Sequence, residues 1–464
     1  MKILYAASEA VPFCKTGGLA DVAGSLPPAL AEQGAETAVI LPLYRRVREK
    51  FADQLMFLCY DYVDLAWRHT YCGLFSMKKD GVTWYFLDNE QYFDRPELYG
   101  YVDDGERFGF FSRAVVKMLD HLEFWPDVIH CNDWQTALIP IYLKDDGVRE
   151  DRYRSIRTVL TIHNIEYQGR YDPYCLGDLF GLDRGWVDDG TLLLDGDLNL
   201  LKGAILTADA VNAVSPTYAQ ELKNPYFAHR MEGILTQCGY KLSGVLNGID
   251  MKLYDPAADG RITANYTAED LSGKAADKTA LQNLMGLNEE PNTPIIAMVS
   301  RLVSHKGLDL LREVMGDIME LPAQFVVLGS GDAGYEEFFR RTAERYPGRM
   351  AVRLGYNEAL SMAIYAGADL FLMPSRSEPC GLSQMISMRY GTVPIVRETG
   401  GLKDTVQPYE AWRDAGTGFT FANYSSADML HVIREAVYLY KDYPDAFARL
   451  RARAMACDFS WARS

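Results

Sequence analysis

The sequence lacks any uninterrupted apolar run of the roughly 18 to 20 residues that a membrane-spanning helix needs. Its apolar start at 2–7 reaches the charged Glu9 too early for the hydrophobic region of a signal peptide. Together these absences predict a water-soluble protein of the cytoplasm.

Basic residues are in the minority, with 47 Lys and Arg against 63 Asp and Glu, which gives a formal net charge of −16. A field of this sign repels polyanions, so nucleic acid is not an expected partner. A membrane is not an expected partner either, because the chain has no apolar run long enough to span one. The eight cysteines are scattered, without a C-x-x-C pair or the dense spacing of a disulfide framework. They are therefore expected to be reduced thiols.

Metal-ligand clusters are also scarce. His130 and Asp133 lie close together in the sequence, but no further His, Cys or acidic cluster nearby completes a site. We therefore expect no metal site.

What the chain has is the composition of a folded globular protein, with 48% hydrophobic and 24% charged residues. At roughly 100 to 200 residues per domain, its 464 residues predict two or three domains.

Short apolar runs recur along the first half, with helix-length segments between several of them. The run 2–8 precedes a glycine-containing loop, a helical pattern and a second run at 35–42, which together predict a βαβ unit. Further strands are expected at 82–87, 127–131, 158–162 and 210–213. This order predicts a largely parallel sheet.

A domain boundary is expected near residue 247, where the series of strands and helices gives way to a polar stretch. A second set of strands is expected after it, at 295–299, 324–328, 350–354, 370–373 and 393–396. The predicted fold class is therefore α/β, with two doubly wound Rossmann-like domains. We expect these at 1–246 and 247–443, followed by a helical segment at 444–464.

Glycines join the first predicted strand to the first helix in the loop K-T-G-G-L-A-D at 15–21. This is neither the G-x-G-x-x-G of a dinucleotide site nor a P-loop. Free backbone N–H groups and the helix dipole attract anions at such a position, and Lys15 adds a cation. The alternative is a plain tight turn.

Two cations, Arg301 and Lys306, follow the first strand of the second half in S-R-L-V-S-H-K-G. Ligands of doubly wound sheets bind at the carboxyl ends of strands, and this pair could neutralise a diphosphate without a metal. The alternative is a solvated surface pair.

Two further motifs follow strands of the second half. Glu378 comes after the strand at 370–373, and its carboxylate can accept hydrogen bonds from a diol. Gly400 and Gly401 come after the strand at 393–396 and precede a helix, where they offer a second anion site.

Polar residues also close two predicted strands of the first half, in H-C-N-D-W-Q at 130–135 and T-I-H-N at 161–164. Because strand carboxyl ends share one edge of a parallel sheet, these side chains are expected to face the same cleft as Lys15.

Taken in order, these segments resemble the bacterial glycogen synthase and plant starch synthase family of retaining glucosyltransferases. The resemblance covers nearly the whole chain through K-T-G-G-L-A-D, H-C-N-D-W-Q, T-I-H-N, V-S-P-T-Y, V-L-N-G-I-D, S-R-L-V-S-H-K-G, E-P-C-G-L and T-G-G-L-K-D-T-V. As an ordered set the motifs are specific. The resemblance implies the GT-B fold, with an acceptor-side and a donor-side domain facing each other across a deep cleft. It also implies that the segment 444–464 crosses back toward the first domain.

The resemblance further implies glycogen synthase activity, in which glucose passes from ADP-glucose to the non-reducing end of an α-1,4-glucan with retained configuration. The expected partners are this nucleotide sugar and a glycogen or maltooligosaccharide acceptor, with no cofactor and no metal. By the same resemblance, catalytic roles fall on His163, Arg301, Lys306 and Glu378. Donor binding falls on Lys15, Gly17, Gly18, Asp21, Asn247, Tyr356, Cys380, Gly381, Leu382, Ser383, Thr399, Gly400 and Gly401. Acceptor binding falls on Asp133, Trp134 and Asn164.

A matching mechanism has Arg301, Lys306 and the glycine-loop amides stabilise the departing diphosphate. The acceptor hydroxyl attacks from the same face and gives its proton to the leaving phosphate, so His163 stabilises rather than acts as a base.

The main alternative is a nucleotide-sugar epimerase or hydrolase on the same fold, since fold alone does not fix function. A requirement for a glucan acceptor separates the two. A pyridoxal-dependent phosphorylase is disfavoured because no lysine stands in a recognisable Schiff-base context. A non-catalytic glucan-binding protein is disfavoured because the charged donor residues are present.

Overall fold

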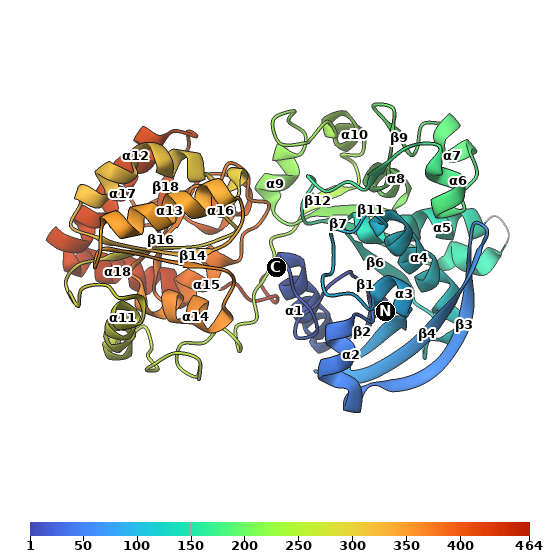
Figure 1. Cartoon of the computed structure of the whole chain (residues 1–464), viewed down its shortest axis with the longest axis horizontal. Coiled ribbons are helices and arrows are strands. Elements are labelled where there is room, and N and C mark those ends of the chain that lie inside the picture. Colours follow the sequence, from blue (N-terminus) through green and yellow to red (C-terminus); the bar gives the residue numbers. More distant parts are fainter. Residues whose placement is uncertain (148–149) are drawn as a thin grey trace. The chain divides into compact units, whose positions relative to one another are not determined.

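The computed structural model describes residues 1–147 and 150–464, which form two compact units. Unit 1 is Met1–Val245 and unit 2 is Leu246–Ser464 (Figure 1). Within the described ranges, no helix combines the length and the apolar character needed to cross a membrane. All eight cysteines are free thiols.

Unit 1 is built on a mixed sheet with the strand order β12-β11-β7-β6-β1-β2-β5-β4-β3. Neighbours from β12 to β5 are parallel, whereas β5, β4 and β3 pair antiparallel. The strands are β1 (Lys2–Ala6), β2 (Glu36–Pro42), β3 (Met56–Leu65), β4 (Arg68–Lys79), β5 (Val82–Asp88), β6 (Val128–Asn132), β7 (Arg157–Ile162), β11 (Ala210–Ala213) and β12 (Leu242–Gly244). A small antiparallel sheet contains β8 (Arg170–Tyr171), β9 (Leu193–Leu194) and β10 (Asp197–Asn199).

Helices connect these strands. They are α1 (Gly18–Glu32), α2 (Arg45–Phe51), α3 (Glu90–Phe93), α4 (Asp104–Lys117), α5 (Leu138–Gly147), α6 (Cys175–Phe180), α7 (Gly185–Asp188), α8 (Leu200–Thr207), α9 (Pro216–Glu221) and α10 (Glu232–Gln237).

Unit 2 contains a parallel sheet with the order β15-β14-β13-β16-β17-β18, and helices lie on both of its faces (Figure 1). Its strands are β13 (Ile295–Val299), β14 (Gln324–Gly329), β15 (Met350–Leu354), β16 (Leu370–Met373), β17 (Val393–Arg397) and β18 (Phe419–Phe421). Its helices are α11 (Ser272–Met285), α12 (Leu308–Glu320), α13 (Ala333–Arg345), α14 (Glu358–Gly367), α15 (Ser383–Arg389), α16 (Gly400–Thr405), α17 (Ser426–Asp442) and α18 (Pro444–Met455).

Burial on both faces explains why the parallel strands could be predicted. All six residues of β14 and all five of β17 are buried, so these strands are continuous runs rather than alternating ones. On α12 the buried residues Leu308, Leu311, Met315 and Ile318 recur at helical spacing and pack into the core of unit 2. The predicted α/β fold class with two doubly wound halves is confirmed.

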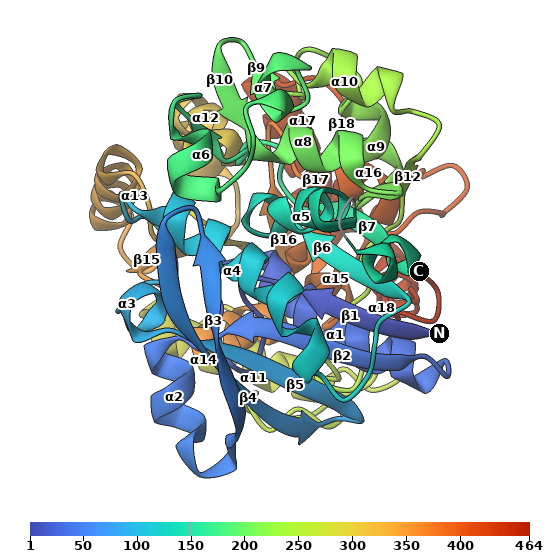
Figure 2. The ribbon, with the colours of Figure 1, turned by 90° about the vertical axis from the view of Figure 1, so that its right-hand side faces the viewer.

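The β3–β4 hairpin was not predicted. It extends unit 1 with two long antiparallel strands, so the sheet is mixed rather than simply parallel (Figure 2). Along β3 and β4 one face is buried, with Val63, Leu65, Cys72 and Leu74 in the core, while the other face carries exposed aromatic side chains. This half-buried alternation is typical of an antiparallel strand.

A buried ionic triad holds unit 2 together across long stretches of chain. Asp369 accepts from Lys278 at 2.8 Å and from Arg451 at 2.9 Å. Burial alone would raise the pKa of the Asp369 carboxyl, but the two cations and the hydrogen bonds lower it overall. Since Arg451 belongs to α18, and Phe447 and Leu450 of that helix lie in the core cluster, α18 is packed into unit 2.

The chain after α18 returns to the start of unit 2. The Ile249 amide donates to the carbonyl of Phe459 at 2.8 Å. A Cβ at Gly248 would lie 2.8 Å from the backbone nitrogen of Trp461, so this approach requires glycine.

Candidate functional site

The predicted glycine loop of unit 1 leads from β1 into α1. Gly17 caps the helix in an extended conformation, and the helix begins at Gly18. The Lys15 ammonium donates to the Asp21 carboxylate at 2.7 Å, and both side chains keep some exposure. The structure therefore brings these four predicted donor-binding residues together at the amino end of one helix.

Glu9, which the sequence analysis missed, anchors this loop. It is buried, and one carboxyl oxygen accepts from both the backbone N–H and the hydroxyl of Thr16. Burial raises the pKa of Glu9 to about 7, although the Thr16 hydrogen bonds oppose the shift. The only signal in the sequence was an acid three residues after a buried strand.

We expect replacement of Glu9 by glutamine to change how stability depends on pH. Above its ordinary pKa of 4.5 the unfolded carboxyl is ionised, whereas the native one holds its proton until about pH 7. The native state therefore binds more protons between these values, so the free energy of unfolding of the wild type falls as pH rises through this window. We therefore expect the free energy of unfolding of Glu9→Gln, measured with urea and compared with that of the wild type, to increase by about 2 kcal/mol from pH 5 to pH 8.

The exposed Glu313→Gln serves as the control for this experiment, since it removes an acid of the same kind from a helix surface. An equal gain in stability for this control over the same pH range would contradict the role assigned to Glu9. The raised pKa of Glu9 would also be contradicted if the free energies of unfolding of Glu9→Gln and wild type changed in parallel with pH.

Asp133 joins the ends of β6 and β7. It sits at a left-handed φ of 54°, and its carboxylate accepts from the backbone N–H of His163 at 2.7 Å and of Asn164 at 3.3 Å. Burial of the carboxyl raises the pKa of Asp133 to about 7 in spite of these hydrogen bonds. Two of the predicted acceptor residues are thus in direct contact with each other and with His163.

The His163 ring is neutral and its tautomer is fixed by neighbours. Its Nε2 lies 2.9 Å from Oδ1 of buried Asn132, whose amide nitrogen donates to the carbonyl of Ala6 at 2.9 Å. Because the Asn132 oxygen can only accept, His163 Nε2 carries the hydrogen. Burial, with a smaller effect from His130, lowers the pKa of His163 to about 3. Such a weak base is poorly suited to removing a proton near pH 7.

Trp134 begins a short 3₁₀ helix, Trp134–Thr136, directly after Asp133. Its ring packs edge-on against Phe108, with centroids 5.3 Å apart, and remains partly exposed. The carboxyl end of β6 therefore presents an aromatic surface beside the carboxylate.

In unit 2 the predicted cation and acid form a pair. The Lys306 ammonium donates to Glu378 at 2.6 Å, and the hydroxyl of Ser375 donates to the same carboxyl oxygen at 2.9 Å. Glu378 is buried and Lys306 nearly so. Burial alone would raise the pKa of Glu378, but the charge and hydrogen bond of Lys306 and the bond from Ser375 lower it overall. The carboxyl is therefore ionised at neutral pH.

The loops after β13 and β16 are also tied by their backbones, since the Arg376 amide donates to the His305 carbonyl at 2.8 Å. Arg301 lies exposed at the end of β13. Tyr356 is 66% exposed in the turn between β15 and α14. These two predicted residues lie at the same strand-end edge but outside the buried pair.

Asn247 and Cys380, predicted from separate motifs, are in contact within unit 2. Burial raises the pKa of the Cys380 thiol to about 12, and hydrogen bonds with the backbone and side chain of Asn247 oppose the shift. Gln384 of α15 then donates to the carbonyls of Cys380 at 3.0 Å and Gly381 at 2.9 Å. The segment after Glu378, which leads through Leu382 into α15 at Ser383, is thus held from both sides.

The glycine pair at the start of α16 packs directly on this segment. Thr399 caps the helix, and a Cβ at Gly400 would lie 2.0 Å from the carbonyl oxygen of Glu378, with φ at +44°. A Cβ at Gly401 would lie 2.2 Å from the carbonyl of Cys380. The Gly401 amide donates to the carbonyls of Glu378 and Pro379, so it is engaged within the protein. The glycines therefore allow close packing of two loops, which the sequence analysis did not foresee.

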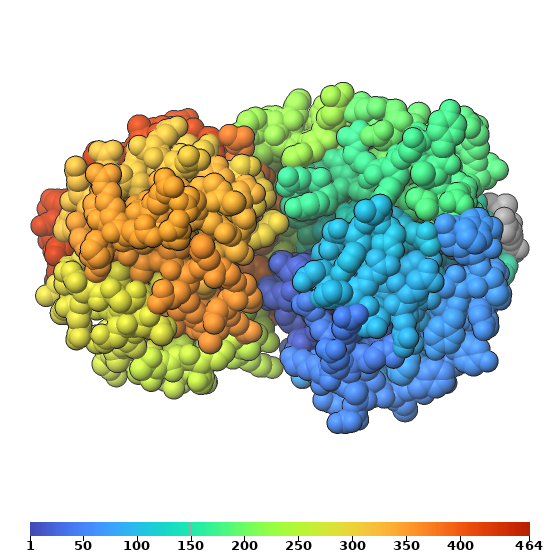
Figure 3. All heavy atoms as spheres, in the orientation of Figure 1, coloured from blue at the N-terminus to red at the C-terminus, as the bar shows by residue number. Residues whose placement is uncertain are grey.

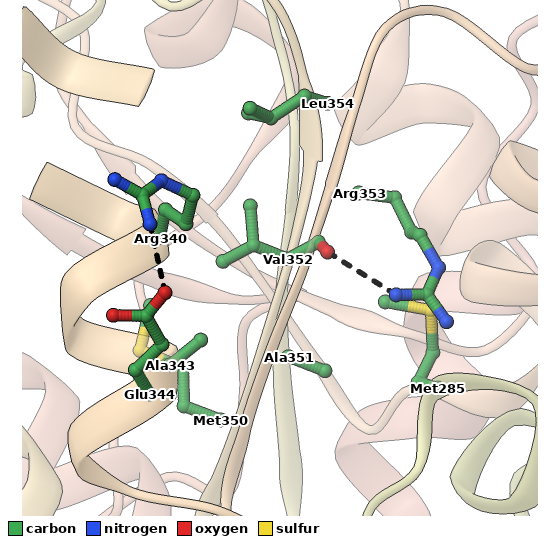
Figure 4. Close-up of a pocket in the computed structure, with 9 residues that line it drawn as sticks. All are labelled: Met285, Arg340, Ala343, Glu344, Met350, Ala351, Val352, Arg353 and Leu354. Atoms are coloured by element: carbon green, nitrogen blue, oxygen red, sulfur yellow. Dashed lines mark hydrogen bonds and ion pairs between the residues drawn. The ribbon is translucent and has the colours of Figure 1, made fainter. Parts of the chain in front are cut away.

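A separate cavity of about 380 Å³ lies between α13 and the edge strand β15 (Figure 4). Its lining includes Met285, Arg340 and Val352 but none of the predicted site residues. Among residues 1–147 and 150–464, no three His, Cys, Asp or Glu side chains gather closely enough to hold a metal ion.

Two doubly wound α/β units with charged residues at their strand ends are the architecture of a GT-B glycosyltransferase. Family comparisons agree: residues 2–237 match the starch synthase catalytic domain and residues 284–448 match glycosyl transferases group 1. The chain belongs to the glycogen and starch synthase family.

Its relatives share nearly its full length. A glycogen synthase of Bacillus cereus is 47% identical over 464 residues, covering 100% of this chain and 97% of the relative. One of Lactobacillus acidophilus is 46% identical with the same coverage. The catalytic domain of starch synthase IV from Arabidopsis thaliana, solved bound to ADP and acarbose, is 34% identical with a TM-score of 0.91, covering 99% of this chain and 96% of that one. The predicted glycogen synthase function is thereby confirmed over the epimerase or hydrolase alternative.

Proposed function

We propose that this glycosyltransferase moves glucose from ADP-glucose to the non-reducing end of an α-1,4-glucan in the cytoplasm, with retained configuration and without a metal. The observation that carries the proposal is the Lys306–Glu378 pair at the carboxyl ends of β13 and β16. The ADP and acarbose bound to the Arabidopsis starch synthase support an adenine nucleotide donor and a glucan acceptor.

In the proposal, unit 2 binds the sugar donor. Arg301 and Lys306 neutralise the diphosphate, and Lys306 is held in place because Glu378 accepts its hydrogen bond. Glu378 is ionised, so its second oxygen can accept hydrogen bonds from glucose hydroxyls. In the proposal Asn247, Tyr356 and the residues of 380–383 and 399–401 complete the donor pocket, with Tyr356 stacking on the base.

Unit 1 supplies the acceptor side, through Asp133, Trp134 and Asn164. We assign Lys15, Gly17, Gly18 and Asp21 to the donor as well, with the amino end of α1 favouring a phosphate. Asp133 fixes the backbone at His163, which orients that residue toward the reacting sugar.

The proposed step needs no side-chain nucleophile. The bond between the glucose anomeric carbon and the phosphate oxygen breaks as the acceptor hydroxyl forms its bond on the same face. Its proton passes to a phosphate oxygen of the leaving diphosphate, because the His163 ring is too weak a base. Arg301 and Lys306 stabilise the growing negative charge, which replaces the role of a metal.

The test is incorporation of labelled glucose into glycogen from ADP-glucose and, in parallel, from UDP-glucose. We expect acceptor-dependent labelling from ADP-glucose, and a loss of about 10²-fold or more in Lys15→Ala and Glu378→Ala, because each removes a charged contact to the donor.

The exposed Lys441→Ala is the matched control and should retain full activity. Release of nucleotide without labelled polymer would reject the proposal in favour of hydrolysis. Preferential use of UDP-glucose would reject the donor assignment alone.

A further inference from the structure

Arg397, the last residue of β17, is a buried cation to which the proposed reaction gives no role. The strands β16 and β17 are paired as far as Met373 and Val396, and Arg397 is the next residue of β17. Its guanidinium donates to the carbonyls of Ser375 at 3.3 Å and of Arg376 at 2.8 Å. The side chain therefore continues the hydrogen bonding between the two segments where the backbone pairing ends.

This linkage lies in the interior of unit 2. Figure 3 shows the surface of unit 2 in colours from yellow-green to red, and β17 lies beneath it, because all five residues of that strand are buried. Arg397 thus acts on the protein itself rather than at its outer surface.

The aromatic ring of Tyr424 holds the guanidinium of Arg397 in place. The ring centroid lies 5.5 Å from the guanidinium carbon of Arg397 and 4.8 Å from that of Arg376, so both cations interact with the ring. The Tyr424 hydroxyl donates to the carboxylate of Asp309 in the first turn of α12. Because Asp309 follows Lys306 by three residues, the network also reaches the loop that carries the donor cation.

The segment that Arg397 holds carries Glu378. The carbonyl of Ser375 accepts from Arg397, and the hydroxyl of the same serine donates to the Glu378 carboxylate at 2.9 Å. The carboxyl oxygen that accepts this bond also accepts from Lys306 at 2.6 Å. A single residue, Ser375, therefore connects the buried guanidinium to the ion pair that the proposed reaction uses.

Hydrogen-bond geometry is what an arginine adds at this position. A guanidinium presents several N–H donors in one plane, so it can bind neighbouring carbonyls at fixed angles. Burial of a cation costs free energy, and an apolar side chain of similar size would avoid that cost. An apolar side chain would fill the space but would leave the loop before Glu378 without these two hydrogen bonds.

We propose that Arg397 is a positioning residue for the Glu378 carboxylate in glucosyl transfer, with Tyr424 holding its guanidinium. This inference rests on the proposed function, in which Glu378 binds the glucose of the donor. A displacement of about 1 Å in an active site can lower the rate by about 10²-fold. Loss of the Arg397 hydrogen bonds lets the loop at 375–378 move, so the transfer step suffers more than nucleotide binding does.

The test compares kcat with nucleotide binding in three variants. Arg397→Met keeps most of the side-chain volume without any donor, and Arg397→Lys keeps a cation with N–H donors. Arg349→Met is the matched control. Arg349 also donates to two backbone carbonyls of unit 2, those of Leu321 and Ala323, but it does so at the amino ends of β14 and β15.

We expect Arg397→Met to lower kcat with ADP-glucose and glycogen by about 10²-fold, while the Kd for ADP, measured by calorimetry, changes by less than about threefold. In the proposal ADP contacts Arg301 and Lys306 but has no glucose for Glu378 to bind. The control Arg349→Met should keep the kcat and the Kd of the wild type.

The lysine variant should recover part of the lost activity. A buried ammonium can hold backbone carbonyls, as Lys274 does with those of Ala366 and Tyr390 at 2.8 Å each. Because an ammonium lacks the planar set of donors, we expect Arg397→Lys to lose about tenfold in kcat.

Wild-type kcat in a folded Arg397→Met would overturn the inference. An equal loss of kcat and of ADP binding would do the same, since it would indicate general damage to the donor side. If Arg397→Met does not fold, Arg397→Lys and Tyr424→Leu replace it, and both should lower kcat by about tenfold with unchanged ADP binding. Wild-type kcat in both of these variants would then overturn the inference.

A wild type that incorporates no glucose from either nucleotide sugar would reject the proposed function. The positioning of Glu378 would then be judged by urea unfolding of Arg397→Met, Ser375→Ala and the combined variant. A combined loss of stability smaller than the sum of the separate losses would support the linkage through Ser375. Additive losses would overturn it.

Discussion

Replacing Lys306 by alanine is expected to lower kcat by about 10³-fold with ADP-glucose, which is the largest effect on catalysis that we predict for one side chain. The ammonium has two tasks in the proposed step, neutralising the leaving diphosphate and holding Glu378 at 2.6 Å. Its loss also leaves the Glu378 carboxylate buried with only the Ser375 hydroxyl as a partner among the contacts described above. Stability should therefore fall by about 3 kcal/mol in urea unfolding.

A second substitution separates the two tasks. Adding Glu378→Gln to Lys306→Ala removes the unpaired charge, so the free energy of unfolding should recover most of its loss. Activity should not recover, because neither the cation nor the ionised acid is present. Recovery of activity in the double variant would show that Lys306 acts only by supporting the fold.

Replacing Gly400 by alanine is expected to give the largest effect from adding a single methyl group. The new Cβ would lie 2.0 Å from the carbonyl oxygen of Glu378, and the residue would keep a φ of +44° that side chains disfavour. The 378–380 segment must move, so we expect destabilisation of about 3 kcal/mol and a loss of kcat of at least about 10²-fold. Urea unfolding and steady-state kinetics measure the two effects.

Gly316→Ala is the matched control for Gly400→Ala. Gly316 lies within α12, and a Cβ there meets nothing within 4 Å. Alanine should stabilise this helix by up to about 1 kcal/mol and leave activity unchanged. Similar behaviour of the two variants would mean that the loop at Gly400 adapts freely and that its packing on Glu378 has little importance.

The parallel strands were predictable because burial on both faces gives continuous apolar runs, as in β14 and β17. The β3–β4 hairpin was missed because its alternation of aromatic, acidic and apolar residues does not stand out as a run. Pattern recognition thus found the strands that share the doubly wound core and overlooked those at its edge.

In the candidate site, too, some residues could be predicted from the sequence and others could not. Residue types at strand ends identified Lys306 and Glu378, which the structure brings into contact. Glu9 could not be found, because its importance comes from burial and from Thr16 seven residues away. The packing of Gly400 on Glu378 was equally invisible, since it joins two loops that the sequence separates by more than twenty residues.

The triad of Lys278, Asp369 and Arg451 has a consequence for synthesis on the ribosome. Asp369 is buried and ionised, but its partner Arg451 lies 82 residues further along the sequence, near the end of the chain. Arg451 is therefore made long after Asp369. Until α18 emerges, unit 2 must either leave this charge half compensated or delay closing its core. All of unit 1, Met1–Val245, is made before unit 2, so we expect it to fold while unit 2 is still being translated.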